Sequence, residues 1–252
     1  MSRAGRAPGA SAAAAASAGR AGIAGGVPDA GSAADAADLA RALQSDAAAM
    51  GWALPDQAAE RLAGYRALLA KWNDTYNLTA LRDPAQVRTQ HLADCLAVVA
   101  PLRRHATGRP LRILDVGSGG GLPGVVLAIV EPAWDVTCVD TVGKKAAFVR
   151  QVAAELGLPN LHAEHARVEA LRAGRPFDLI TSRAFASLPD FVRLTRPLLA
   201  PAGAWMAMKG KRPDDEIAAL PPGVQVQAVE PLQVPGLEAE RCLLWLVPTA
   251  AP

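Results

Sequence analysis

A glycine-rich stretch that directly follows an apolar segment is the first candidate for chemistry in this sequence. Residues 111–124 read Leu-Arg-Ile-Leu-Asp-Val-Gly-Ser-Gly-Gly-Gly-Leu-Pro-Gly. Glycine tolerates backbone angles that other residues avoid, and it lets a ligand lie against the main chain. In doubly wound α/β sheets, the turn after the first strand is where ligands bind. The stretch therefore predicts a ligand-binding loop, and a packing turn without a ligand is the plainer alternative.

Two aspartates near this loop restrict what it can bind. Three of its glycines fit the G-x-G-x-x-G fingerprint of dinucleotide-binding proteins, which keeps an NAD-linked oxidoreductase open. However, Gly117 already ends the strand, and Asp115 would repel a pyrophosphate, whereas it could orient the loop or attract a cation. Asp140 ends the next apolar run, where a carboxylate can accept both ribose hydroxyls. These features favour an adenosine with a positive sulfonium and an amino-acid tail over a dinucleotide.

Arg183 is the strongest candidate outside the loop. It follows the largely apolar residues 177–180, so we expect it at the carboxyl end of a central strand, where the ligand crevice opens. Its planar fork of donors could bind a cofactor carboxylate, or O6 of guanine and a phosphate. The plainer alternative is a surface ion pair with Asp190 or a neighbouring residue.

Other polar residues are weaker candidates. Lys209, Lys211 and Arg212 follow the next strand and could hold RNA phosphates, although a solvated charge run explains them nearly as well. His91 and Asp94 are spaced for one face of a helix, but a metal site needs a third ligand. We therefore expect no metal, and a hydrogen-bonded cap instead.

The elements that must position these residues alternate between strand and helix after Pro110. This alternation predicts an α/β fold with a seven-stranded, mostly parallel sheet covered on both faces. The last two strands lack a long helix between them, which suits an antiparallel hairpin at the sheet edge. The strands are expected at 111–116, 134–140, 161–164, 177–182, 203–208, 224–229 and 241–247. The helices between them are expected at 124–130, 144–156, 188–199 and 214–220.

The segment before the sheet divides into two parts. Residues 1–38 contain almost no large apolar side chain, which predicts a disordered extension without a targeting peptide. Residues 39–108 carry apolar residues at helical spacing, most clearly over 56–72, and predict an N-terminal helical cap. The α/β domain then spans residues 109–252.

Composition excludes several classes of protein. The 252 residues include 26 basic and 24 acidic side chains, and a net charge of +2 is too small to bind nucleic acid without local patches. Three scattered cysteines form neither a disulfide framework nor a zinc ribbon and indicate a reduced, cytoplasmic protein. No window holds the roughly 18 apolar residues of a membrane helix.

Several motifs occur in consistent order across residues 54–247. They are Trp72-Asn73 with Tyr76-Asn77-Leu78-Thr79, His91 with Asp94, the loop from Leu114 to Gly119 with Gly121-Leu122-Pro123-Gly124, Ser182-Arg183-Ala184-Phe185-Ala186, Lys209-Gly210, and Leu232-Gln233-Val234-Pro235. With these motifs, the chain resembles the RsmG, or GidB, family of methyltransferases that modify guanine N7 in 16S ribosomal RNA. The glycine loop alone is weak evidence, but its Leu-Pro-Gly ending with Ser-Arg-Ala-Phe and Tyr-Asn-Leu-Thr is highly specific.

The resemblance implies a class I S-adenosylmethionine-dependent methyltransferase with a Rossmann-like sheet. Its substrate would be 16S rRNA within the small ribosomal subunit or an assembly intermediate, and we expect a monomer that needs no metal. Arg183 is the expected catalytic residue. One departure is Cys95, where the family usually has serine. The implied cofactor contacts are Gly117, Leu122, Val168, Glu169 and Arg183, and the fold logic adds Asp140.

The implied chemistry explains why the sequence shows no obvious general base. Guanine N7 has an in-plane lone pair and needs no deprotonation, so catalysis should consist mainly of positioning and of tolerating the charge that moves onto guanine. A small-molecule methyltransferase remains an alternative because it would share the cofactor loop. An NAD-linked oxidoreductase is the further alternative.

Overall fold

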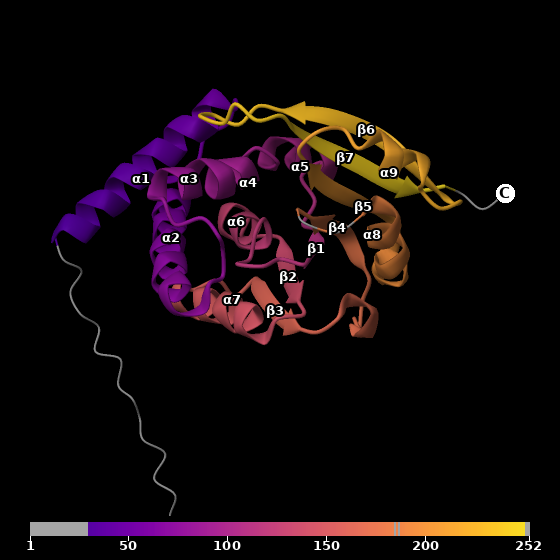
Figure 1. Ribbon diagram of the computed structural model, residues 1–252, viewed down its shortest axis with the longest axis horizontal. Helices are drawn as coiled ribbons and strands as arrows, with labels where there is room; N and C mark the ends of the chain where they lie inside the picture. The colour runs from indigo at the N-terminus through magenta and orange to yellow at the C-terminus, as the bar shows by residue number, and fades with distance from the viewer. Residues whose placement is uncertain (1–29, 184, 186, 250–252) are drawn as a thin grey trace, which may run out of the picture.

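The computed structural model describes residues 30–183, 185 and 187–249, and these form a twisted sheet with helices on both faces (Figure 1). Seven strands of this described part lie in the order β3-β2-β1-β4-β5-β7-β6. Strands β1 to β5 are parallel, and β7 is antiparallel to β5 and β6. The predicted α/β sheet and its edge hairpin are thus confirmed. The bounds are β1 (Arg112–Val116), β2 (Asp135–Asp140), β3 (Leu161–His165), β4 (Phe177–Ser182), β5 (Leu199–Lys209), β6 (Val224–Leu232) and β7 (Arg241–Pro248).

The strand order reverses at the centre of the sheet. Strand β1 pairs with β2 on one side and with β4 on the other, so successive strands continue outward in opposite directions. In open parallel sheets, ligands bind outside the carboxyl ends of the strands at such a reversal. Gly117 follows β1 and Arg183 follows β4. Both residues therefore lie where a ligand site is expected.

Side chains along the central strands alternate between two apolar clusters, one on each face. Ile113 of β1 and Leu179 of β4 belong to one cluster, and their neighbours Leu114 and Ile180 belong to the other. A strand buried on both faces must be apolar at consecutive positions, which explains the continuous apolar runs in the sequence. The first cluster includes residues of α6 (Gly124–Val130) and α7 (Gly143–Glu155), and the second includes residues of α8 (Leu188–Thr195).

The helix predicted over 188–199 is shorter in the structure. Helix α8 ends at Thr195, the 3-10 turn η3 (Arg196–Leu198) follows, and β5 already begins at Leu199. Pro197 lies in this turn and lacks the N–H that an α-helix would need there. Strand β5 therefore begins before the predicted residue 203. The last helix of the described part, α9 (Asp214–Ala218), is also shorter than the predicted 214–220.

The residues before β1 form the predicted helical cap. Their buried side chains belong to the same apolar cluster as α6 and α7, so the cap and one face of the sheet share a core. No helix of the described residues is long and apolar enough to cross a membrane. The cap elements are α1 (Ala30–Ala49), α2 (Asp56–Tyr76), α3 (Pro84–Val87), the π-helical segment η1 (Arg88–Ala93), α4 (Asp94–Leu96) and α5 (Val99–Ala106).

The predicted disordered extension over 1–38 is wrong for its last part. Helix α1 begins at Ala30, and Ala36 packs against the apolar core. The prediction relied on the scarcity of large apolar side chains, but alanine has the highest helix propensity and can pack closely against another helix. Helix α1 packs against α2 in this way. Residues 1–29, the rest of that prediction, lie outside the described residues.

Phe148 of α7 joins the cap to the sheet. The side chain is fully buried, and its ring lies 6.1 Å from that of Tyr65 and 5.5 Å from that of Trp72, both on α2. These distances are typical of aromatic pairs that stabilise a core. The cap is therefore held over α7 by an aromatic contact as well as by aliphatic packing.

Replacing Phe148 with alanine should strongly destabilise the protein. A cavity would open between α2 and α7, and Phe→Ala substitutions in cores lower the free energy of unfolding by about 3–5 kcal/mol. Urea denaturation of wild type, Phe148→Ala and Phe148→Leu would measure the loss. The leucine variant keeps more of the volume and should lose less. Equal stabilities for wild type and the alanine variant would contradict this role.

Candidate active site

The turn after β1 is held in shape by Asp115, whose side chain is completely buried. Its Oδ2 accepts a hydrogen bond from the Gly124 N–H, at the start of α6, at 2.8 Å. A Cβ at Gly124 would come within 2.9 Å of this oxygen, so a side chain does not fit there. Burial raises the pKa of Asp115 to about 7. Of the two roles considered for Asp115, the structure supports orienting the loop, because a buried carboxylate cannot meet a ligand cation.

Asp140, at the end of β2, anchors the other side of the turn. Its Oδ2 accepts a hydrogen bond from the Gly119 N–H at 2.9 Å, and its Oδ1 accepts one from the Val142 N–H at 2.8 Å. Gly117 adopts a φ of +67°, which strongly favours glycine. Each oxygen of Asp140 keeps a second lone pair. The carboxylate can therefore hold the loop and still accept a hydrogen bond from a ligand.

A cavity of about 450 Å³, here called the β1–β2 cavity, opens beside this turn. Gly117, Asp140, Val168 and Glu169 all line it, the last two from the 3-10 turn η2 (Val168–Ala170) after β3. Its volume lies in the range of small-molecule sites, about 300–1,000 Å³. Leu122 instead lies in the apolar core and is only 4% exposed. The structure thus brings four of the six predicted cofactor residues together and leaves Leu122 and Arg183 outside the group.

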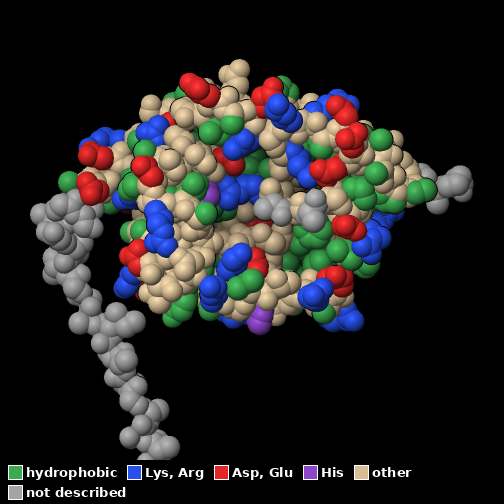
Figure 2. Space-filling model, in the orientation of Figure 1, with side chains coloured by type: hydrophobic (Ala, Val, Ile, Leu, Met, Phe, Trp, Pro, Cys, Tyr) green, Lys and Arg blue, Asp and Glu red, His purple; other side chains and the backbone are tan. Residues whose placement is uncertain are grey.

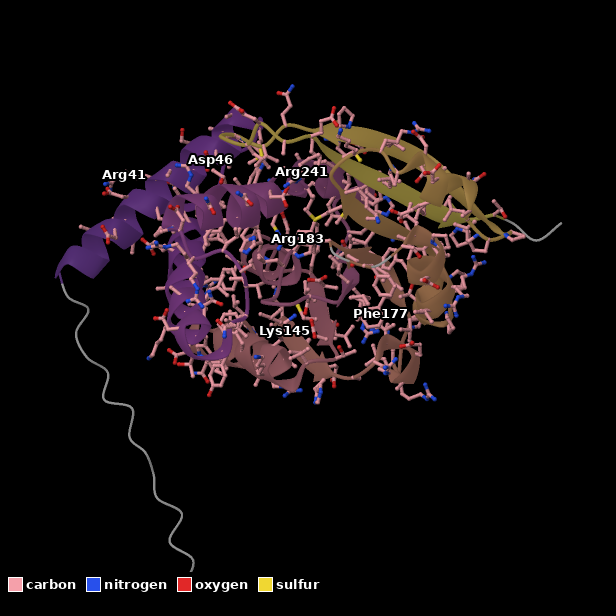
Figure 3. All side chains as sticks on the ribbon, viewed as in Figure 1. Arg41, Asp46, Lys145, Phe177, Arg183 and Arg241 are labelled. Atoms are coloured by element: carbon pink, nitrogen blue, oxygen red, sulfur yellow. The ribbon has the colours of Figure 1, made fainter. Side chains whose placement is uncertain are left out.

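A second cavity of about 400 Å³, here called the β4–β5 cavity, lies at the ends of those two strands. Arg183 lines this cavity, whereas Phe185, two residues further on, lines the β1–β2 cavity, so the two cavities are neighbours. Figure 2 shows a hollow on this face with Lys and Arg side chains around it. In Figure 3, Arg241 and Arg183 both lie in this central region. The polar residues that line the β4–β5 cavity include Gln90, His91, Asp94, Arg183, Lys209 and Arg241.

Arg183 is fixed by the cap rather than by the sheet. Its Nη1 donates a hydrogen bond to the carbonyl oxygen of Gln90 at 2.9 Å and lies 3.5 Å from Oδ2 of Asp94. The alternative of a surface ion pair with Asp190 is wrong, because Asp190 pairs with Arg193 at 2.6 Å. The backbone after β4 points Arg183 toward the cap, and sequence spacing could not show this.

His91 supports the same contact from the π-helical segment. Its Nε2 lies 2.8 Å from Oγ1 of Thr79, and its Nδ1 lies 3.3 Å from Nη1 of Arg183. Burial, and then the neighbouring guanidinium, lower the pKa of His91 from its usual value of 6.5. A neutral ring can accept a hydrogen bond from Arg183 at Nδ1. Asp94, the other residue of this motif, is paired with Arg183 and Arg241. Both residues therefore take part in contacts between the cap and the α/β domain, which supports the expected hydrogen-bonded cap.

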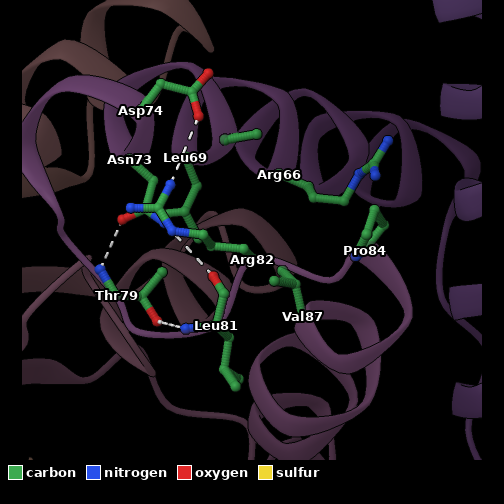
Figure 4. A pocket seen from close by; sticks show the side chains of 10 residues that line it. Arg66, Leu69, Asn73, Asp74, Thr79, Leu81, Arg82, Pro84 and Val87 are labelled. Carbon is green, nitrogen blue, oxygen red and sulfur yellow. Dashed lines mark hydrogen bonds and ion pairs between the residues drawn. The ribbon is translucent and has the colours of Figure 1, made fainter.

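The motif residues around Asn73 fold the loop that presents Thr79. Oδ1 of Asn73 accepts a hydrogen bond from the Thr79 N–H at 2.9 Å, and Oγ1 of Thr79 accepts one from the Leu81 N–H at 3.2 Å (Figure 4). This loop borders a cavity of about 150 Å³ within the cap. None of the predicted site residues lines it. The Trp-Asn and Tyr-Asn-Leu-Thr motifs thus act on the site indirectly, through Thr79 and His91.

The cationic cluster after β5 is largely neutralised by acidic neighbours. Nζ of Lys209 lies 2.9 Å from a carboxylate oxygen of Glu216, and Nε of Arg212 lies 2.6 Å from one of Asp214. Lys211 is exposed. Only Lys209 lines the β4–β5 cavity. The predicted cluster therefore does not act as one patch.

Tyr65 is a site residue that sequence reasoning placed only in an apolar stripe. Its ring is fully buried, and its hydroxyl donates a hydrogen bond to the carbonyl oxygen of Gly120 at 2.7 Å. The cap helix α2 therefore holds the glycine loop directly. A stripe of apolar and aromatic residues carries no signal for this contact, because its partner is 55 residues away. The same applies to Arg241, which reaches the site from β7.

Known proteins share this architecture. The solved structure of the Burkholderia thailandensis 1,6-didemethyltoxoflavin-N1-methyltransferase, with bound 1,6-didemethyltoxoflavin and S-adenosylhomocysteine, matches with a TM-score of 0.51 and 19% identity, over 74% of this chain and 89% of that one. At that identity the likeness concerns the fold alone. The fold and its glycine-loop cavity define a class I S-adenosylmethionine-dependent methyltransferase. The chain belongs to the GidB family, described as rRNA small subunit methyltransferase G, which matches residues 58–244.

Relatives with high sequence identity carry the name that describes this family. The chain is 60% identical to the ribosomal RNA small subunit methyltransferase G of Leptothrix cholodnii, over 82% of this chain and 94% of that protein. It is 58% identical to the protein of the same name from Acidovorax ebreus, over 84% and 96%. This membership decides against the NAD-linked oxidoreductase.

Removing the Tyr65 hydroxyl should loosen the glycine loop. Tyr65→Phe leaves the partly buried carbonyl oxygen of Gly120 without its donor, which should cost about 1 kcal/mol of folding free energy. We also expect weaker binding of S-adenosylmethionine, measured by calorimetry. The matched control is Tyr76→Phe, because the Tyr76 side chain is 42% exposed. Unchanged stability and affinity in Tyr65→Phe would contradict the contact.

The lowered pKa of His91 should make stability fall at acidic pH. Because the folded state disfavours the protonated ring, the neutral ring's contribution is complete above about pH 6.5 and is lost as the pH falls through the lowered pKa. Urea denaturation of wild type and His91→Gln from pH 5 to 8 would test this. The stability advantage of wild type should shrink below about pH 6.5. A constant difference across the range would refute the assignment.

Proposed function

We propose that this protein transfers a methyl group from S-adenosylmethionine to N7 of a specific guanine in 16S ribosomal RNA. We further propose that it acts as a cytoplasmic monomer on the small subunit or on an assembly intermediate. The observation that carries the proposal is the pair of neighbouring cavities at the strand ends, one beside the glycine loop and one lined by arginines. Membership of the GidB family supports the same acceptor.

The β1–β2 cavity fits the cofactor by its volume, by its exposed backbone and by its carboxylate. Gly117 would let an adenosine lie against the main chain, since a Cβ there would meet nothing within 4 Å and the space is open. Asp140 would accept the ribose hydroxyls, and Val168 and Glu169 would border the adenine. Leu122 would support the loop from below as a buried residue. The bound cofactor supplies a sulfonium methyl, the group to be transferred.

Arg183 would act on the acceptor side. It lines the cavity next to the cofactor cavity, and its guanidinium is partly exposed there, at 25% of the side chain. A guanidinium can donate to O6 of guanine or to a flanking phosphate. Because the cap fixes this group before substrate arrives, it would orient the base at little cost in entropy. This role favours the guanine contact over the cofactor carboxylate.

The chemistry then requires geometry more than proton transfer. Guanine N7 carries a lone pair and no proton, so no side chain would have to remove a proton, and the bound cofactor would supply the methyl group from its carbon–sulfur bond. Holding N7 in line with that bond can lower the barrier by several kcal/mol. The residues around the two cavities would supply this alignment.

The proposed reaction is tested on small subunits from cells that lack this methyltransferase. Purified protein and labelled S-adenosylmethionine are added to intact subunits, to deproteinised 16S rRNA and to a small-molecule extract. Chemical cleavage at N7-methylguanine should reveal one new site in 16S rRNA. Label that appears only in small molecules would instead support the small-molecule alternative.

Arg183→Ala should lower the rate of methyl transfer by about 100-fold or more, the scale seen when a preorganised donor is removed. The fold should survive, because Asp94 keeps Arg241 as a partner at 2.9 Å. Single-turnover assays and thermal melts would measure both effects. Arg193→Ala, which removes an exposed arginine of α8, is the matched control. Wild-type activity in Arg183→Ala would rule out the assigned role.

A further inference from the structure

Asp94 lies between two arginines that come from distant parts of the chain. Asp94 is the first residue of α4, directly after the π-helical segment, and its side chain is 4% exposed. Oδ1 lies 2.9 Å from Nε of Arg241, and Oδ2 lies 3.5 Å from Nη1 of Arg183. Each oxygen thus faces a different guanidinium. All three residues line the β4–β5 cavity.

This arrangement fixes the position of both guanidiniums. Arg183 follows β4 and Arg241 begins β7, so neither strand by itself determines where the two side chains meet. A carboxylate buried among partners has little freedom to move, and long arginine side chains lose their own freedom when they pair with it. Gln90 completes the site by accepting a hydrogen bond from Arg183 at 2.9 Å through its backbone carbonyl.

The same carboxylate sets the charge of the cavity. Lys209 also lines the cavity but is paired with Glu216 at 2.9 Å, so the two guanidiniums and the Asp94 carboxylate leave a net charge of +1, enough to attract a guanine edge or a phosphate. Guanine gains positive charge as its N7 is methylated, so an additional positive charge beside it would raise the barrier. Removing the Asp94 charge would therefore improve the attraction for RNA while it slows the reaction.

We propose that Asp94 is a positioning residue that holds Arg183 and Arg241 and limits the positive charge beside the methyl acceptor. This inference rests on the proposed function of the site and assigns it a residue beyond Arg183. Asp94 itself need not touch the RNA, because its two oxygens are directed at the arginines. Removing its charge is expected to lower kcat without weakening the binding of either substrate.

The test compares Asp94→Asn with wild type. The asparagine amide has nearly the same shape as the carboxylate but carries no charge, and its single oxygen can accept a hydrogen bond from only one of the two arginines. We expect kcat on small subunits to fall at least about tenfold, since small displacements at an active site can cost far more. The KM for small subunits should stay the same or decrease, and the Kd for S-adenosylmethionine should change by less than about twofold. Asp94→Glu, which restores the charge, should recover part of kcat.

The matched control is Asp135→Asn at the opposite end of the sheet. Asp135 begins β2 and lies 3.3 Å from Nε of Arg112, so this variant also removes a carboxylate that pairs with an arginine. It should keep wild-type kcat and KM. A kcat of Asp94→Asn within threefold of wild type would overturn the proposal. So would a parallel loss of cofactor affinity, RNA affinity and melting temperature, because that pattern indicates general damage to the fold.

A second measurement does not depend on activity. In nitrogen-15 NMR spectra, the Nε–H of Arg241 should exchange slowly with solvent in wild type and rapidly in Asp94→Asn. Unchanged exchange would overturn the positioning role even if kcat falls. If wild type methylates no RNA but this exchange still depends on Asp94, the proposed function fails while the contact stands. The two hypotheses can therefore be separated.

Discussion

The burial of a parallel sheet on both faces is the constraint on which this protein depends. Helices cover the two apolar surfaces of the central strands, so the polar groups of the site are confined to the ends of those strands. The strand order reverses between β1 and β4, which separates the connections there and leaves room for ligands. The glycine loop and Arg183 both lie at this reversal, because they follow β1 and β4. The topology of the sheet therefore determines where a ligand site can form, and the side chains determine what it can bind.

The helical cap completes the site from the other direction. It shares an apolar core with α6 and α7, and the Tyr65 hydroxyl reaches the glycine loop while Gln90, His91 and Asp94 hold Arg183. The π-helical segment η1 contains two of these three residues. Such segments are rare and are frequently found at functional sites. The cap therefore directly contacts both the glycine loop beside the β1–β2 cavity and Arg183 in the β4–β5 cavity.

Three buried aspartates have different functions because their partners differ. Asp115 accepts a backbone N–H and shapes the loop, Asp140 accepts two and still lines a cavity, and Asp94 pairs with two arginines. A buried carboxylate is costly unless it is hydrogen-bonded or paired. Asp94 and Asp140 satisfy this requirement at both oxygens, whereas Asp115 does so only at Oδ2, and burial raises its pKa to about 7. Each carboxylate thereby holds neighbouring groups of the candidate site in place.

The sequence by itself determined the α/β class, the hairpin at the edge, the glycine loop and the family, because these depend on local patterns of apolar residues, glycines and short motifs. It also indicated Gly117, Asp140, Val168 and Glu169, which line one cavity in the structure. It failed at residues 30–38, which were predicted to be disordered but form the first part of helix α1 and pack against the core. Only the tertiary structure decided that Arg183 meets Asp94 and that Tyr65 meets Gly120. Such contacts join residues far apart in the chain, and their geometry depends on how the cap packs on the sheet, which no local pattern records.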